Sequence, residues 1–417
     1  LLAREAIKRG WIDEEGDAAM RASAQEIMQG AAAQLTETDG NQRQIIPALW
    51  PDTAFRDHGL RGDLSEFDGV RYEEEETFSG NLEECKYIDA VASVMNRRME
   101  VDERIFCMGE DIHRLKGGTN GATKGLADRF PDRVVPTPIA ELGFTGLAGG
   151  VAMEGTYRPV VELMYPDFSL VAADQLFNQI GKARHMFGGD TEMPIVVRTK
   201  IALGSGYGSQ HSMDPAGLYS QWPGWRIVAP STPFDYVGLM NSALQCQDPV
   251  LMIEHVGLYT TGGLGPVDDF DYFIPLGKAK IVRPGNRFTV LTYSAMVAPT
   301  IAAAEQMGLD AEIIDLRSLD RAGIDWELVG DSIHKTNNVV VVEQGPLTVS
   351  YGAMLTDEIQ RRFFDDLDQP VKRIHGGESS PNVSKVLERS AFVGEEEIRA
   401  GFAEIMTDMG LGLVAAQ

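Results

Sequence analysis

Short apolar runs alternate with segments of helical periodicity along most of the chain. The runs lie at residues 105–108, 134–135, 160–164, 194–198, 225–229 and 249–253, and again at 288–292, 311–314 and 338–342. Helical periodicity falls between or after them, for example at residues 143–155, 168–187, 298–307 and 352–364. Runs that are apolar along their whole length and alternate with helices predict parallel strands covered on both faces. The pattern therefore indicates an α/β fold.

A segment rich in Gly, Asp and Pro, residues 256–275, divides the strands into two sets and predicts a domain boundary. We therefore expect two three-layer domains, each built on a parallel sheet, at residues 81–265 and 276–417. Residues 1–35 carry helical periodicity, with Asp13 placed before an acidic first turn. Because the first residues read as the middle of a helix, we expect this chain to be a piece of a longer one.

Residues 36–80 lose the periodicity and are rich in Gly, Pro, Asp and Asn, which predicts a long linker. Such a linker is either mobile or laid across another surface. Its acidic run, residues 73–76, is typical of a solvated segment.

The composition excludes several classes of function. The chain has 417 residues, 43% of them hydrophobic, and a formal net charge of -25. That charge argues against a binder of nucleic acid or of anionic membranes, because both need Lys and Arg. The three cysteines form no close pair in the sequence, which predicts no disulfide framework and fits a reducing cytoplasm.

Familiar phosphate, metal and hydrolase motifs are missing from the sequence. It has no Walker A motif, no Gly-x-Gly-x-x-Gly that opens a helix after a strand, and no Gly-x-Ser-x-Gly elbow. The glycines from Gly204 to Gly208 have the wrong spacing for a dinucleotide turn. The seven histidines are scattered, so no metal site is expected on this chain.

Two features remain as candidate chemistry. Glu141 is an isolated acid within a small and apolar stretch, residues 138–150, and His211 ends a glycine-rich loop that begins at Gly204. An ionisable group that is buried without a partner is costly, and such groups gather at functional sites. We therefore predict that Glu141 and His211 have functional roles.

Ten short motifs resemble those of a known family. In order they are Gly109-Glu-Asp, Thr137-Pro-Ile-Ala-Glu-Leu-Gly-Phe, Arg158-Pro-Val-Val-Glu-Leu-Met, Asp167-Phe, Asp174-Gln, Gln210-His-Ser, Pro223-Gly-Trp, Pro230-Ser-Thr-Pro, Asp315-Leu-Arg-Ser-Leu and Val341-Val-Glu-Gln-Gly. With this order and spacing, residues 85 to about 400 resemble the β subunit of the E1 component of 2-oxoacid dehydrogenase complexes, a relative of transketolase. Residues 1–35 resemble the end of the E1 α subunit, which implies the C-terminal portion of an α–β fusion.

The resemblance implies a transketolase-like pyrimidine-binding domain, a transketolase C-terminal-like domain and an activity. The activity is decarboxylation of a 2-oxoacid on thiamine diphosphate, followed by reductive acylation of the lipoyl group of an E2 partner. Glu141 aligns with the acid that hydrogen-bonds N1′ of the cofactor's pyrimidine. Phe168 aligns with the aromatic residue that stacks on this ring, and Met164 with another wall of the pocket.

The resemblance assigns two more residues to the catalytic machinery. His211 aligns with the active-site histidine near the substrate carboxylate or the acyl-transfer route. Its loop departs from the His-His-Ser-Gln form of some members, because Gln210 precedes His211 and Met213 follows Ser212. Glu110 aligns with an acid on a proton path between paired sites.

The family's Mg²⁺ and diphosphate motif, Gly-Asp-Gly followed by Asn, does not occur in the sequence. The resemblance therefore implies that the Mg²⁺ ligands lie on an α portion and that no metal ligand lies here. It also implies three partners: an α-type segment, fused upstream or separate, a second copy as in an α2β2 assembly or a fused homodimer, and a lipoylated E2.

Two alternatives stay open at this point. One is an acetoin-cleaving or transketolase-like carboligase that uses thiamine diphosphate without a lipoyl acceptor. The other is a non-catalytic regulatory or structural subunit that keeps the fold. The sequence does not name the 2-oxoacid, since one methylene in a pocket discriminates by only about 1–3 kcal/mol.

Overall fold

The computed structural model describes residues 64–114, 116–187 and 191–410, and five residues ahead of them. These five are helical with exposed side chains: Ala18, Ala19, Ala22, Glu26 and Gln29. Apart from them, the predicted helical tail and the predicted linker up to residue 63 lie outside the described residues. Among the residues that are described, no helix combines the length and the apolar character needed to cross a membrane.

Six parallel strands form the first sheet, in the order β3-β2-β4-β5-β7-β6. They are β2 (Ile105–Gly109), β3 (Val134–Pro136), β4 (Arg158–Glu162), β5 (Val196–Ile201), β6 (Arg226–Val228) and β7 (Val250–His255). One face packs against α3 (Tyr87–Val101) and α8 (Pro233–Gln245). The other packs against α5 (Glu141–Glu154) and the irregular helical segment at 166–186. Side chains that alternate along each strand thus feed two separate apolar layers.

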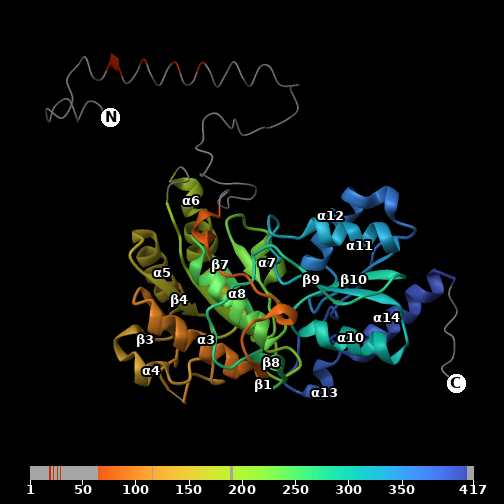
Figure 1. Cartoon of the computed structure of the whole chain (residues 1–417), viewed down its shortest axis with the longest axis horizontal. Helices are drawn as coiled ribbons and strands as arrows, with labels where there is room; N and C mark the ends of the chain where they lie inside the picture. Colours follow the sequence, from red (N-terminus) through yellow and green to blue (C-terminus); the bar gives the residue numbers. More distant parts are fainter. Residues whose placement is uncertain are drawn as a thin grey trace. The chain divides into compact units, whose positions relative to one another are not determined.

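Five strands form the second sheet, in the order β13-β12-β10-β11-β9. They are β9 (Lys280–Arg283), β10 (Phe288–Thr292), β11 (Ala311–Asp315), β12 (Val339–Val342) and β13 (Lys372–Ile374). Figure 1 shows α10 (Val297–Gln306) and α14 (Glu395–Asp408) on one side of this sheet, and α11 (Trp326–Thr336) and α12 (Tyr351–Phe363) on the other. The predicted fold class, two three-layer α/β domains with parallel sheets, is confirmed.

The predicted pattern missed several smaller elements. Strand β9 runs antiparallel to β11, and a separate antiparallel pair joins β1 (Leu82–Lys86) to β8 (Gly262–Pro266). Strand β8 and α9 (Val256–Tyr259) lie inside the segment that was expected to be only a boundary loop. The remaining short helices are η3 (Ser65–Phe67), η4 (Glu75–Thr77), α4 (Leu126–Arg129), η5 (Pro131–Arg133), α7 (Ala216–Ser220), η9 (Ser294–Met296), η10 (Phe364–Asp366) and α13 (Lys385–Glu388).

The single helix predicted at residues 168–187 is wrong in form. The segment divides into η6 (Pro166–Leu170), a π-helix η7 (Asp174–Gln179), η8 (Ile180–Lys182) and α6 (Ala183–Met186). The indole N–H of Trp225 donates to the Leu176 carbonyl at 3.1 Å, within the π-helical turn. A side chain that enters the backbone ladder is a known cause of such irregularity. Trp225 thus accounts for the break that periodicity alone could not reveal.

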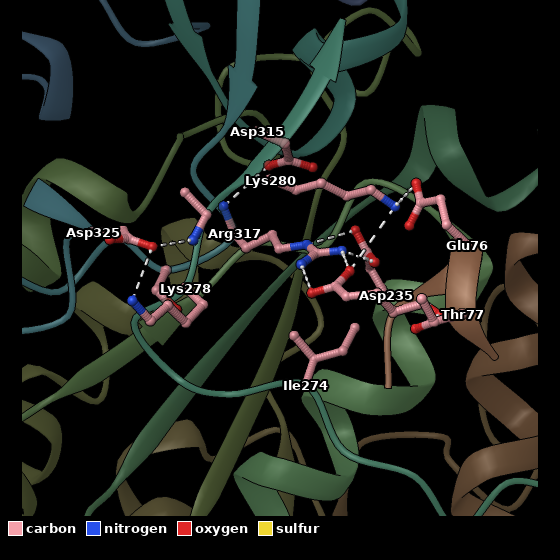
Figure 2. A network of polar contacts seen from close by, with 12 residues as sticks. Glu76, Thr77, Asp235, Ile274, Lys278, Lys280, Asp315, Arg317 and Asp325 are labelled. Carbon is pink, nitrogen blue, oxygen red and sulfur yellow. Dashed lines mark hydrogen bonds and ion pairs between the residues drawn. The ribbon is translucent and has the colours of Figure 1, made fainter. Parts of the chain in front are cut away.

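The acidic run at residues 73–76 is not simply solvated. Glu74 forms a bidentate ion pair with the buried Arg317 of the second domain at 2.8 Å, and Arg317 also pairs with Asp235 on α8 of the first. Figure 2 shows Arg317 and Asp235 with Lys280, which reaches Glu76 at 2.8 Å. The described part of the predicted linker is therefore laid across the junction between the two sheet domains.

Candidate active site

The chain order of the first sheet has a switch point at the carboxyl ends of β2 and β4. After β2 the chain continues to β3 on one side of it, and β4 then enters on the other side. In open parallel sheets, ligands bind outside the carboxyl ends of the strands at such a switch point. Glu110 directly follows β2 and Met164 lies just beyond β4. The fold thus directs two of the predicted site residues to this edge.

Glu141 and Glu110 lie close together at this edge. Glu141 is the first residue of α5, follows β3, and is only 7% exposed. The β2 and β3 ends are tied by the Thr137 N–H, which donates to the Gly109 carbonyl at 3.0 Å. Burial, and after it the charge of Glu141, raises the pKa of Glu110 to about 7. An acid with a raised pKa beside a second buried carboxyl group can share or pass a proton.

The raised pKa of Glu110 makes a testable contribution to stability. An acid with an ordinary pKa of 4.5 and a folded pKa of about 7 binds more protons in the folded state between those pH values. Its contribution to stability is therefore lost as pH rises from about 4.5 to 7. We expect Glu110→Gln to be more stable than the wild type at pH 8 and nearly equal to it at pH 4.5, in urea midpoints measured at both.

The matched control for this comparison is Glu103→Gln, which changes an exposed glutamate shortly before β2. It should leave the difference between the two pH values unchanged. A stability gain in Glu110→Gln that is the same at both pH values would contradict the assignment.

His211 lies in an aromatic enclosure at the end of the glycine loop, which we define as residues 204–211. Its ring centroid is 4.5 Å from that of Tyr165, 5.4 Å from that of Phe168 and 6.0 Å from that of Tyr207. The structure therefore brings two predicted site residues, Phe168 and His211, into contact. Met164 is half-buried at the same strand end.

A buried ion network below this enclosure was missed by the sequence reasoning. Arg198 on β5 contacts Glu254 on β7 at 2.7 Å and Glu162 on β4 at 3.5 Å. Lys200, also on β5, lies 3.3 Å from Glu162, and its ammonium lies 5.0 Å from the ring centroid of Tyr165. Two cations and two anions thus balance inside the sheet. The available signal was a charged residue inside an otherwise apolar strand, because such residues are rarely buried unless paired.

Three buried polar atoms at this edge have no hydrogen-bond partner among the described residues. They are Glu110 Oε1, Thr137 Oγ1 and His211 Nδ1. Buried polar groups are nearly always hydrogen-bonded, so unpaired atoms on segments that follow β2, β3 and β5 fit a site for a ligand or a partner group. Beside them stand a buried acid and an aromatic wall, which suit a flat, nitrogen-containing ring. No cluster of three or more His, Cys, Asp or Glu that could hold a metal occurs in the described part of the chain.

The helix that begins at Glu141 exposes apolar side chains. Leu142, Leu147 and Met153 are all exposed on α5. A groove of about 240 Å³ lies between this helix and the segment at 174–187, lined by Gly146, Gly150 and other mainly apolar residues. An apolar face that continues from a buried catalytic candidate is typical of a surface covered by another chain segment.

Comparison with known proteins agrees with this geometry. The model of the transketolase pyrimidine-binding domain matches residues 83–261, and that of the transketolase C-terminal domain matches residues 277–398. A solved structure described as a split-gene transketolase in an inactive β4 tetramer shares the fold, with a TM-score of 0.61, 18% identity, and coverage of 77% of this chain and 98% of that one.

Three other relatives are more similar in sequence. The chain is 39% identical over 306 residues to pyruvate dehydrogenase E1 component subunit beta-2, chloroplastic, of Arabidopsis thaliana, covering 72% of this chain and 74% of the relative. It is 37% identical to the mitochondrial subunit beta-1 of Oryza sativa subsp. japonica, covering 77% and 87%. It is 35% identical to the 2-oxoisovalerate dehydrogenase subunit beta of Bacillus subtilis, covering 76% and 98%. Since relatives include organellar forms, the cytoplasmic location stays a prediction.

Proposed function

This chain belongs to the family of 2-oxoacid dehydrogenase E1 β subunits, and from that premise we propose that it supplies the pyrimidine-binding half of an active site. That site would decarboxylate a 2-oxoacid with thiamine diphosphate and reductively acylate the lipoyl group of an E2 partner. The observation that carries the proposal is a buried acid, Glu141, that begins the helix after β3, together with an aromatic enclosure around His211 whose Phe168 follows the end of β4.

Glu141, Phe168 and Met164 would hold the cofactor's pyrimidine. When bound, thiamine diphosphate supplies the carbon nucleophile and the electron sink that decarboxylation of a 2-oxoacid requires. Glu141 would keep a hydrogen bond to a ring nitrogen, at a position where burial excludes competing water. Phe168 is half-buried, and its ring contacts that of His211.

Glu110 and His211 would transfer protons near the pyrimidine that Glu141 holds. Glu110, with a pKa of about 7 because of burial and the neighbouring Glu141, is suited to exchange protons at neutral pH. His211 has an unpartnered buried Nδ1 and is enclosed by rings, so it is available to a substrate group.

The second half of the site would come from an α-type segment that carries the Mg²⁺ and diphosphate ligands. The exposed apolar face of α5, which begins at Glu141, supports this partner because any covering chain there would also border the acid. Two of the relatives are themselves described as β subunits of an E1 component. We propose an assembly of paired α and β portions, whether the α portion is fused upstream or separate, that delivers its product to a lipoylated E2.

The test is reconstitution of the chain with an α-type segment, Mg²⁺ and thiamine diphosphate. Pyruvate, branched-chain 2-oxoacids and acetoin are then supplied with and without a lipoylated E2 domain. The proposal expects decarboxylation of a 2-oxoacid coupled to acylation of the lipoyl group. Turnover of acetoin or carboligation that needs no lipoyl acceptor would replace it with the carboligase alternative, and cofactor binding without any turnover would favour a regulatory subunit.

A further inference from the structure

The glycine loop is held at its tip by a residue from the second sheet domain. Its base is closed by the Ala202 N–H, which donates to the His211 carbonyl at 3.0 Å. At the tip, the Glu388 carboxylate of α13 accepts two backbone hydrogen bonds, from the Gly204 N–H at 2.9 Å and the Gly206 N–H at 2.8 Å. Glu388 is 1% exposed, so this contact is made away from water.

The loop backbone is shaped for this contact. Gly204 and Gly206 have φ angles of +85° and +78°, in the left-handed region that favours glycine. A Cβ on Gly206 would lie 3.1 Å from the Val383 carbonyl and from Lys385 Cγ, so the loop packs directly on the segment that precedes Glu388. Charge-assisted bonds to a buried carboxylate are among the stronger hydrogen bonds. Glu388 therefore fixes the backbone path of the loop and its distance from α13.

The clamped part of the loop carries one wall of the histidine enclosure. Tyr207 stands between Gly206 and Gly208, and a Cβ on Gly208 would lie 2.9 Å from Val383 Cγ1. The Tyr207 ring in turn contacts those of Tyr165 and His211, with centroids 5.6 Å and 6.0 Å apart. A chain of contacts thus runs from Glu388 through the loop tip to the ring of His211.

We propose that Glu388 is a positioning residue for His211, acting through the two loop amides and Tyr207 without touching substrate or cofactor. The proposal rests on the function proposed above, in which His211 serves the substrate side of the site. Its consequence is that the second domain sets the geometry of a catalytic loop that belongs to the first.

The test uses the assembled complex and two readouts. The first is the rate at which diethyl pyrocarbonate modifies His211, followed by peptide mass spectrometry, with the buried His255 as an internal reference. The second is the steady-state rate of lipoyl acylation, separated into kcat and KM. Loss of hydrogen bonds to a charged group should increase the population of the released loop roughly tenfold. Glu388→Ala should therefore raise the modification rate of His211 and lower kcat, each by about that factor. Glu388→Gln, which keeps one acceptor, should fall between.

The matched control is Glu396→Gln, which removes an exposed carboxylate that pairs with Arg389 at 2.7 Å and does not bond the loop amides. It should match the wild type in both readouts. Gly206→Ala disturbs the same contact from the loop side. If Glu388→Ala folds poorly, Gly206→Ala should still show the faster His211 modification and the lower kcat. The proposal is overturned if His211 reactivity stays at the wild-type rate in these variants, if Glu396→Gln has an equal effect, or if His255 becomes reactive in parallel, which marks general unfolding.

Histidine modification needs no turnover, so it separates this proposal from the previous one. A wild-type complex that binds cofactor but never turns over would defeat the proposed function and leave the labelling comparison intact. A wild type that turns over, with Glu388→Ala equal to it in labelling, would defeat only the positioning role.

Discussion

Glu141→Gln is expected to slow exchange of the C2 proton of bound thiamine diphosphate by about 10²–10⁴-fold, the usual contribution of a positioned acid or base. The substitution keeps the side-chain shape but removes the carboxyl group that can hold a proton at the pyrimidine. Because Glu141 is 7% exposed and begins α5, water has little room to take over its role. The exchange is measured by NMR on the assembled complex, with cofactor affinity determined separately.

Glu154→Gln is the control for that experiment, since it makes the same change at the exposed last residue of the same helix. It should leave both exchange and affinity at the wild-type level. An unchanged exchange rate in Glu141→Gln would remove Glu141 from the role proposed here. A complex that no longer binds the cofactor would assign the residue to binding.

The strands and the layer order could be predicted because they depend on local apolar patterns. The strand interior at residues 249–253 is apolar throughout, and it forms part of β7 between β5 and β6. Glu141 and His211 could be proposed because an acid among small residues and a histidine after glycines are unusual in themselves. The helix expected at residues 168–187 failed because Trp225, about fifty residues away in the sequence, takes one of its carbonyls.

Long-range polar contacts could not be predicted for a related reason. The positive charges of Lys200 and Arg198 pair with the negative charges of Glu162 and Glu254 only after three strands align. No spacing along the chain predicts these ion pairs. The partnership of Glu388 with Gly204 spans 184 positions in the sequence. The resemblance to a family suggested roles for residues that stand out in the sequence, such as Glu141 and His211. Residues that hold them in place, such as Glu388, could be identified only from the structure.

The junction between the domains gives the largest expected effect on stability. Arg317 is fully buried and has a φ of +52°. Its guanidinium pairs with Asp235 at 2.6 and 3.0 Å and with Glu74 at 2.8 Å, as Figure 2 shows for Asp235. The cation therefore joins α8 of the first domain, β11 and its following turn in the second, and the acidic segment.

Arg317→Met should lower the free energy of unfolding by about 3–5 kcal/mol, because it leaves a buried carboxylate without its counter-ion. The loss should be greater at pH 8 than at pH 5. Burial and the charge of Asp235 raise the pKa of Asp315 to about 7, while the charge of Arg317 opposes this rise. Without the arginine that pKa rises, so the variant's folded state holds a proton up to a higher pH than the wild type's. Denaturant midpoints at the two pH values measure both effects.

Arg321→Met is the matched control, four residues along the chain. Arg321 pairs with Glu358 at 3.1 Å and is itself 39% exposed, and Glu358 keeps Arg361 and Arg362 as further partners. Because Arg321 is open to solvent and Glu358 keeps two other cations, loss of this pair should cost about 0–1 kcal/mol, and the two arginine variants should differ several-fold in the stability they lose. Equal losses would mean that the Arg317 network adds nothing beyond ordinary surface pairing. A large loss confined to Arg317 would show that the acidic segment, Asp235 and the second domain are held together through one buried cation.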